Sequence, residues 1–97
     1  SISCMTDSEV IDAVQKAQCA YVSAVTRANR ARRRAASAAF SFFGSTDVEQ
    51  AARNNAIQRA ELTCSEAINR ATDKRRAALA AIRVNAGAWA DLVPEAA

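Results

Sequence analysis

The densest group of charges in this chain is a run of arginines in its first half. Five arginines fall within eight consecutive positions, at Arg27, Arg30, Arg32, Arg33 and Arg34. Guanidinium groups pair well with phosphates and carboxylates, so the run predicts a site for phosphate or for an acidic partner. No aromatic residue lies among these arginines to stack on bases, which favours a solvated helix face that pairs with another subunit.

Arginines also fall where a helix would face its neighbour. Arg32 and Arg75 occupy equivalent places in two similar segments, and Arg76 follows directly. An arginine at a helix seam needs a polar partner. We expect Asp12 to face Arg75 and Asn55 to face Arg32, and we interpret these pairs as a device that sets the register of the helices rather than as a ligand site.

The cysteines limit the chemistry that is available. Cys4, Cys19 and Cys64 make an odd count, and the chain has no histidine and no CxxC motif. Zinc binding and the common nucleophile–base pairs are therefore not expected. The carboxylates are scattered and there is no glycine-rich phosphate loop, so we expect no enzyme activity and no cofactor. Two alternatives stay open for the thiols, which are either free and buried or joined in a disulfide within or between chains.

A five-residue unit that recurs four times shows how these residues are positioned. It occupies Ala13–Ala17, Ala24–Ala28, Ala56–Ala60 and Ala67–Ala71. The step is 11 residues within each pair and 43 residues between the pairs. Eleven residues correspond to three turns of about 3.67 residues, so one stripe of each segment stays on one helix face. The pattern predicts two helices with 11-residue repeats that arose by internal duplication.

Capping signals set the expected bounds of these helices. A threonine is followed three residues later by a glutamate in both Thr6–Glu9 and Thr46–Glu49, the pattern of a capping box. A short connection between helices is typical of an antiparallel hairpin. We therefore predict an all-α fold with a single helical-hairpin domain over residues 1–97. Its parts are a helix over about 7–43, a turn at 44–46, a second helix over about 47–87 and a C-terminal tail over 88–97.

The composition predicts that this hairpin associates with other subunits. The chain has 97 residues and 51% hydrophobic residues, but many of these are alanine, and only 5% are aromatic. Two alanine-rich helices bury little large apolar surface by themselves. Apolar residues also lie off the main stripes, at Ile11, Val22, Phe40, Phe42, Leu62 and Val84. The residues expected at a subunit interface are Val14, Tyr21, Val25, Phe40, Phe43, Ile57, Ile68, Leu79, Ile82, Trp89 and Leu92.

These features favour a structural protein that self-assembles, most simply as the subunit of a helical filament or a pilus-like polymer. A basic protein that binds or coats nucleic acid is the first alternative, because the net charge is +3. A closed helical-bundle dimer that acts as an adaptor is the second. No apolar run reaches the length of a membrane span. The start at Ser1 rather than Met is consistent with a removed leader or an artificial start, and we expect an extracellular or cell-surface location, otherwise a cytoplasmic one.

Overall fold

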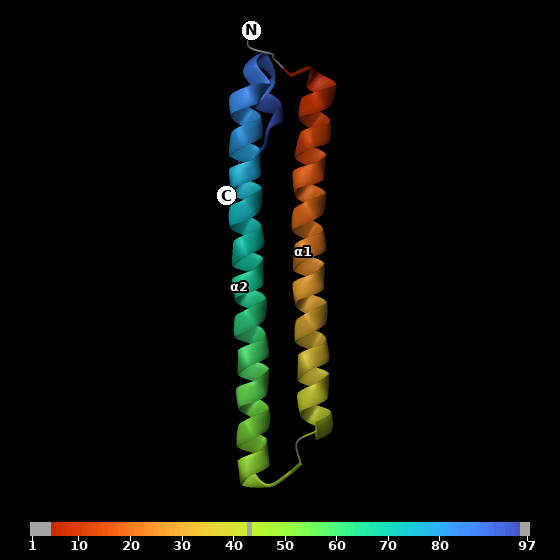
Figure 1. Ribbon diagram of the computed structural model, residues 1–97, viewed down its shortest axis with the longest axis vertical. Helices are drawn as coiled ribbons and strands as arrows, with labels where there is room; N and C mark the ends of the chain where they lie inside the picture. The colour runs from red at the N-terminus through yellow and green to blue at the C-terminus, as the bar shows by residue number, and fades with distance from the viewer. Residues whose placement is uncertain (1–4, 43, 96–97) are drawn as a thin grey trace. The chain divides into compact units, whose positions relative to one another are not determined.

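A computed structural model of the protein describes residues 5–42 and 44–95, apart from the side chain of Phe42. The described residues form helix α1 (Asp7–Phe42), helix α2 (Asp47–Ala86) and a short 3-10 helix, η1 (Gly87–Leu92) (Figure 1). They contain no strand. The protein is therefore all-α, as predicted, with two long helices joined by a short connection. The expected end of the first helix at residue 43 lies outside the described residues.

Both long helices begin at the predicted capping boxes, which are confirmed. The Thr6 hydroxyl accepts the Glu9 amide at 3.2 Å, and the Glu9 carboxylate accepts the Thr6 amide at 3.4 Å. The Thr46 hydroxyl likewise accepts the Glu49 amide at 3.2 Å. These contacts satisfy amides that have no partner within the helix, and they place a negative charge at the positive end of each helix dipole.

The contacts divide the chain into two compact units. Unit 1 comprises Ser1–Ser23 with Arg70–Ala97, and unit 2 comprises Ala24–Asn69. In unit 1, Val10 lies in one cluster with Ala86, while Tyr21 contacts Arg75. Partners therefore run in opposite directions, and α1 and α2 are antiparallel within this unit. Contacts of Asn29 with Cys64 and of Phe40 with Arg53 give the same result for unit 2.

Unit 1 contains the larger of the two cores. Val10, Leu79, Ala86 and Val93 are buried together. Partly buried residues pack around this cluster, namely Met5, Val14, Ala17, Ile82 and Ala90. Val10 is the largest side chain that is fully buried in the described residues. Even this core is therefore small, because the helices meet mainly through alanine and valine.

The chain reverses direction after α2 and covers the core of unit 1. Gly87 has a φ of 58°, a left-handed conformation that glycine adopts without a steric penalty. η1 then folds back beside the last turns of α2 (Figure 1). Val93 enters the core, and a guanidinium nitrogen of Arg83 donates a hydrogen bond to its carbonyl at 2.8 Å. The segment expected as a tail is thus a 3-10 helix packed on its own unit.

Unit 2 has much less interior. Its buried residues among those described are Ala28, Ala39 and Cys64. The Cys64 thiol lies 3.6 Å from the Asn29 side-chain oxygen, to which it donates a weak hydrogen bond. Small side chains at this seam let the two backbones approach closely but remove little apolar surface from water.

Candidate functional site

Two half-buried arginines, Arg53 and Arg75, lie against aromatic rings. The Arg75 guanidinium carbon lies 4.1 Å from the centroid of the Tyr21 ring, and that of Arg53 lies 5.1 Å from the Phe40 ring. The Nε atoms of both arginines are buried without a hydrogen-bond partner. Cation–π attraction is therefore the contact that the structure provides for these charges.

The expected partners of the seam arginines were wrong. Among the described residues, no ion pair joins Asp12 to Arg75 and no hydrogen bond joins Asn55 to Arg32. Arg75 faces Tyr21 instead, nine residues beyond Asp12 along α1. Asp12 is exposed and lies about two and a half turns before Tyr21, so it is on the opposite side of α1 from the residue that contacts Arg75.

The arginine cluster predicted in the first half lies on α1 in unit 2. Arg27, Arg30, Arg33 and Arg34 are exposed, while Arg32 is half-buried. Within the part of the chain that the structure describes, none of them forms an ion pair. The spacing of Arg27, Arg30 and Arg34 by three and four residues places these three on one side of the helix. They form a basic face that no carboxylate of the described residues neutralises through an ion pair.

Most residues predicted at a subunit interface are partly covered by their own unit. The half-buried ones are Val14, Tyr21, Val25, Ile57, Ile68 and Ile82. Leu79 is buried in the core of unit 1, because η1 folds back and places Val93 beside it, and so it offers no surface to a partner. Phe40, Trp89 and Leu92 are exposed. Phe43 lies outside the described residues, as does Cys4.

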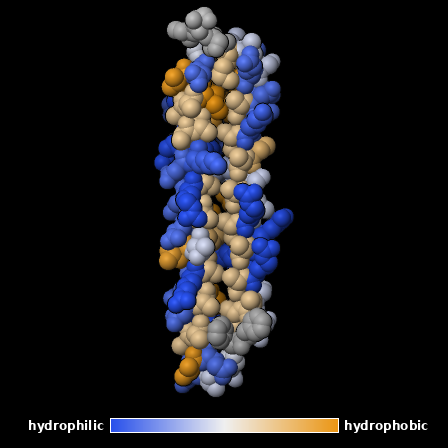
Figure 2. Space-filling model, in the orientation of Figure 1, coloured by the Kyte–Doolittle hydropathy of each residue, from blue (hydrophilic) through white to orange (hydrophobic). Residues whose placement is uncertain are grey.

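Large apolar side chains nevertheless remain on the surface of both units. Figure 2 shows strongly hydrophobic side chains, in orange, exposed among hydrophilic ones, in blue. In unit 2, Phe40, Val48 and Leu62 are 62%, 80% and 61% exposed. Unit 1 exposes Ile11, Val22, Val84, Trp89 and Leu92. Val48 and Leu62 lie about four turns apart on one side of α2, away from Cys64 and the seam.

Unit 2 also contains a groove between its two helices. The groove has a volume of about 390 Å³ and is open to solvent. Its walls are mainly alanine, from Ala28, Ala31 and Ala35 on α1 and from Ala56, Ala60 and Ala67 on α2. Thr63 and Cys64 complete the lining. Methyl side chains on both helices leave space where larger ones would interdigitate.

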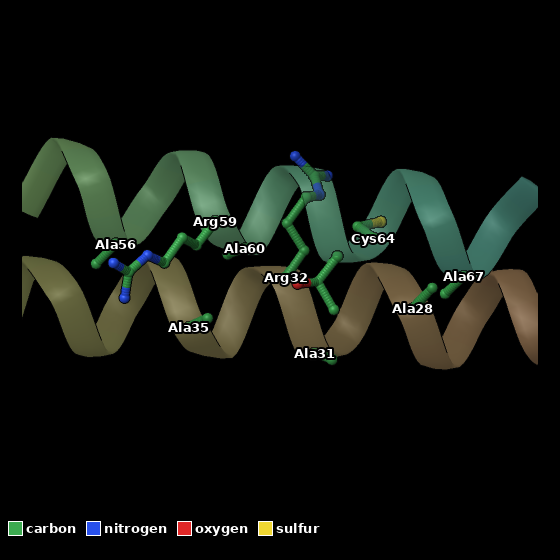
Figure 3. Close-up of a pocket in the computed structure, with 10 residues that line it drawn as sticks. Ala28, Ala31, Arg32, Ala35, Ala56, Arg59, Ala60, Cys64 and Ala67 are labelled. Atoms are coloured by element: carbon green, nitrogen blue, oxygen red, sulfur yellow. The ribbon is translucent and has the colours of Figure 1, made fainter.

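Two arginines border this groove. Figure 3 shows Arg59 reaching from α2 toward α1, and Arg32 reaching from α1 toward α2. Neither guanidinium forms an ion pair within the described part of the chain. The groove therefore combines an apolar floor with two unneutralised positive charges, which suits a group that carries both an apolar body and a carboxylate.

The charge is divided unequally between the units. Unit 2 has seven arginines against four carboxylates, a net charge of +3, whereas unit 1 has six basic and six acidic side chains. The last eleven residues contain Asp91 and Glu95 and no basic residue. Neither carboxylate forms an ion pair in the described residues. The chain thus has a basic unit and an acidic end.

The described cysteines are free thiols. Cys19 is exposed on α1 in unit 1, and Cys64 is buried in the groove wall of unit 2. The alternative of a buried free thiol therefore describes Cys64, whereas the pairing expected for Cys4 stays a prediction. Within the described residues, no group of three or more Cys, Asp or Glu side chains is arranged to hold a metal ion.

Some features of this surface were not predicted from the sequence. Arg53, Arg59 and Val48 are not among the functional candidates that the sequence predicts. Arg59 belongs to the repeated unit Ala56–Ala60. The alanines at the ends of this unit are small, and they line the groove beside Arg59. Arg53 gave no signal, because its contact with Phe40 depends on the register of the two helices.

Comparison of the chain with protein families, with curated proteins and with solved structures found no match. Neither described helix contains an apolar stretch long enough to cross a membrane. Function is therefore inferred from the residues of this chain and their arrangement.

Proposed function

We propose that this protein is a non-enzymatic structural protein that self-assembles, as the subunit of a helical filament or pilus-like polymer. The observation that supports the proposal is that unit 2 buries few apolar side chains and exposes several large ones. Its described core consists of two alanines and a cysteine, while Phe40, Val48 and Leu62 are exposed. Full burial of such a side chain contributes about 1.5–3 kcal/mol, so contact between copies supplies stabilisation that the single chain lacks.

The positions of the exposed residues support a polymer in particular. Exposed apolar side chains lie on α1, on the outer side of α2 and on η1. Several distinct surfaces permit heterologous contacts, in which one surface of a copy meets a different surface of the next. Such contacts extend into a helical polymer unless their rotation closes a ring. The 11-residue repeats and the proposed duplication would present similar surfaces at regular intervals along each helix.

Mass measurement over a range of concentrations tests this proposal. We expect multi-angle light scattering to show a mass that rises with protein concentration, and electron microscopy of the same sample to show fibres. A mass that stays at two chains favours the closed dimer acting as an adaptor. A monomer that persists at tens of micromolar and physiological salt rules out self-assembly.

The arginine face of α1 supports a second candidate function, the binding or coating of nucleic acid. Arg27, Arg30 and Arg34 are exposed on one side of the helix and have no acidic partner in the described residues. Phosphate contacts of this kind release counterions, so the affinity falls steeply with salt. A gel-shift titration at increasing salt tests it, with the triple substitution R27Q, R30Q and R34Q as the variant expected to lose binding. Equal shifts for both proteins would reject a role for this face.

A further inference from the structure

The short helix η1 carries apolar side chains and a carboxylate, which complement the apolar floor and the arginines of the groove in unit 2. η1 presents Trp89 and Leu92, which are 43% and 44% exposed. Asp91 lies between them in sequence and is also exposed. Tryptophan and leucine provide apolar bodies, and Asp91 provides a carboxylate, on one short and well-supported element. A side chain such as tryptophan is a frequent centre of binding energy at protein interfaces.

We propose that η1 of one copy docks into the alanine-lined groove of unit 2 in another copy. Trp89 and Leu92 would occupy the space over Ala31, Ala35 and Ala60, where they would be removed from water. This inference rests on the self-assembly proposed above and names the contact through which it occurs.

Charge complementarity selects this occupant of the groove. Arg32 and Arg59 border the hollow without an acidic partner, and Asp91 lacks a basic one, in the described residues. Docking brings these unpaired groups together at the edge of an apolar contact, where a carboxylate–guanidinium pair is stronger than on an open surface. Among the described residues, the other exposed apolar side chains do not combine an aromatic ring with a carboxylate two positions away.

The contact is made between copies. Within its own chain, η1 is held on unit 1 by Val93 in the core and by the hydrogen bond from Arg83. The groove is lined by residues of unit 2 alone. Because the two surfaces differ, the contact is heterologous. In a pair of copies, one keeps an unused groove and the other an unused η1, so further copies can add at both ends.

Trp89 is the single tryptophan of the chain and reports the contact directly. As the concentration of the wild-type protein rises and its mass increases, we expect Trp89 emission to shift to shorter wavelengths. The substitution Ala31→Phe fills the groove from an exposed position, and we expect it to raise the concentration needed for assembly by about tenfold or more. Ala38→Phe, at an exposed alanine of the same helix that does not line the groove, is the matched control.

Charge reversal tests the polar part of the contact. We expect Asp91→Arg and Arg59→Asp each to weaken assembly and the double variant to recover it, with circular dichroism confirming that the helices form in all three. Assembly of the wild type with unchanged Trp89 emission, or an equal effect of Ala31→Phe and Ala38→Phe, would overturn the docking contact and leave self-assembly in place. A wild type that stays monomeric overturns both.

Discussion

At the scale of single residues, the half-buried arginines Arg53 and Arg75 lie against aromatic rings rather than carboxylates. Arg75 was recognised from its repeat position as an arginine at the seam, and that much follows from sequence periodicity. Its predicted partner, Asp12, was wrong, because Asp12 lies nine residues before Tyr21, on the opposite side of α1, and Tyr21 is the residue that contacts Arg75. Charge patterns indicate that a partner exists, but not which one.

The contact between Arg75 and Tyr21 leads to the first prediction. Replacement of Tyr21 by Phe keeps the ring and its negative face, whereas replacement by Leu keeps apolar volume but removes the cation–π contact. We expect Tyr21→Leu to lower the free energy of unfolding by about 0.5–2 kcal/mol more than Tyr21→Phe. Urea denaturation measures the difference.

A double-mutant cycle with Arg75→Met provides the control for this prediction. In the Arg75→Met background the difference between the two Tyr21 variants should vanish, since no cation remains to contact the ring. A difference of the same size in both backgrounds would attribute the effect to packing alone.

The second prediction concerns the carboxylate of Glu49. A hydrogen bond from the Thr46 hydroxyl at 2.7 Å, followed by one from the Gly44 amide at 2.7 Å, lowers the pKa of Glu49 from its ordinary value of 4.5. A lowered pKa in the folded state means that the stabilisation is complete above pH 4.5 and is lost as the pH falls through the folded value. Acid should therefore weaken the start of α2.

Comparison with Glu49→Gln measures this pH dependence. The difference in urea midpoint between wild type and Glu49→Gln should be constant from neutral pH down to about pH 4.5 and should shrink below it. Glu66→Gln, which removes a carboxylate at an exposed position of α2 outside the cap, serves as the matched control. A gap that widens on acidification would contradict the assignment.

At the scale of helices, the sequence predicts those features that depend on near neighbours in the chain. Thr6 with Glu9 and Thr46 with Glu49 fix both helix starts, because a capping box needs contacts over only three residues. The continuous helical period predicts α1 and α2 in the same way. The placement of η1 was not predictable, since it depends on where Val93 finds a complementary hollow, and this also explains why Leu79 is in the core rather than at an interface.

The reversal at Gly87 gives the third prediction. A residue with a Cβ at a φ of 58° costs about 1–2 kcal/mol relative to glycine. We therefore expect Gly87→Ala to lower the free energy of unfolding by about that amount. Asparagine tolerates the left-handed conformation better than alanine, so Gly87→Asn should lose less. Thermal unfolding followed by Trp89 fluorescence compares the two, and equal losses would argue against the backbone conformation as the cause.

At the scale of the whole molecule, composition predicts that the core is small. It does not predict which apolar residues remain exposed to solvent, because that depends on their position around each helix. The off-stripe residues Ile11, Val22, Leu62 and Val84 are all exposed, whereas most residues on the stripes are at least half covered. The stripes are used to join the two helices within each unit. The surface available to other copies therefore lies mainly on the flanks and outer sides of the helices.

The fourth prediction follows from this division between seam and outer surface. Leu62→Gln and Val84→Gln alter exposed positions on the outer side of α2, so each should change the stability of the isolated chain by no more than about 0.5 kcal/mol. If copies cover these side chains, loss of about 1.5 kcal/mol of contact should raise the concentration needed for assembly by roughly tenfold. Ala81→Gln, an exposed alanine of α2, should leave assembly unchanged. Light scattering across a dilution series measures all three proteins. Variants that assemble like the wild type would show that Leu62 and Val84 on α2 remain in water in the assembly.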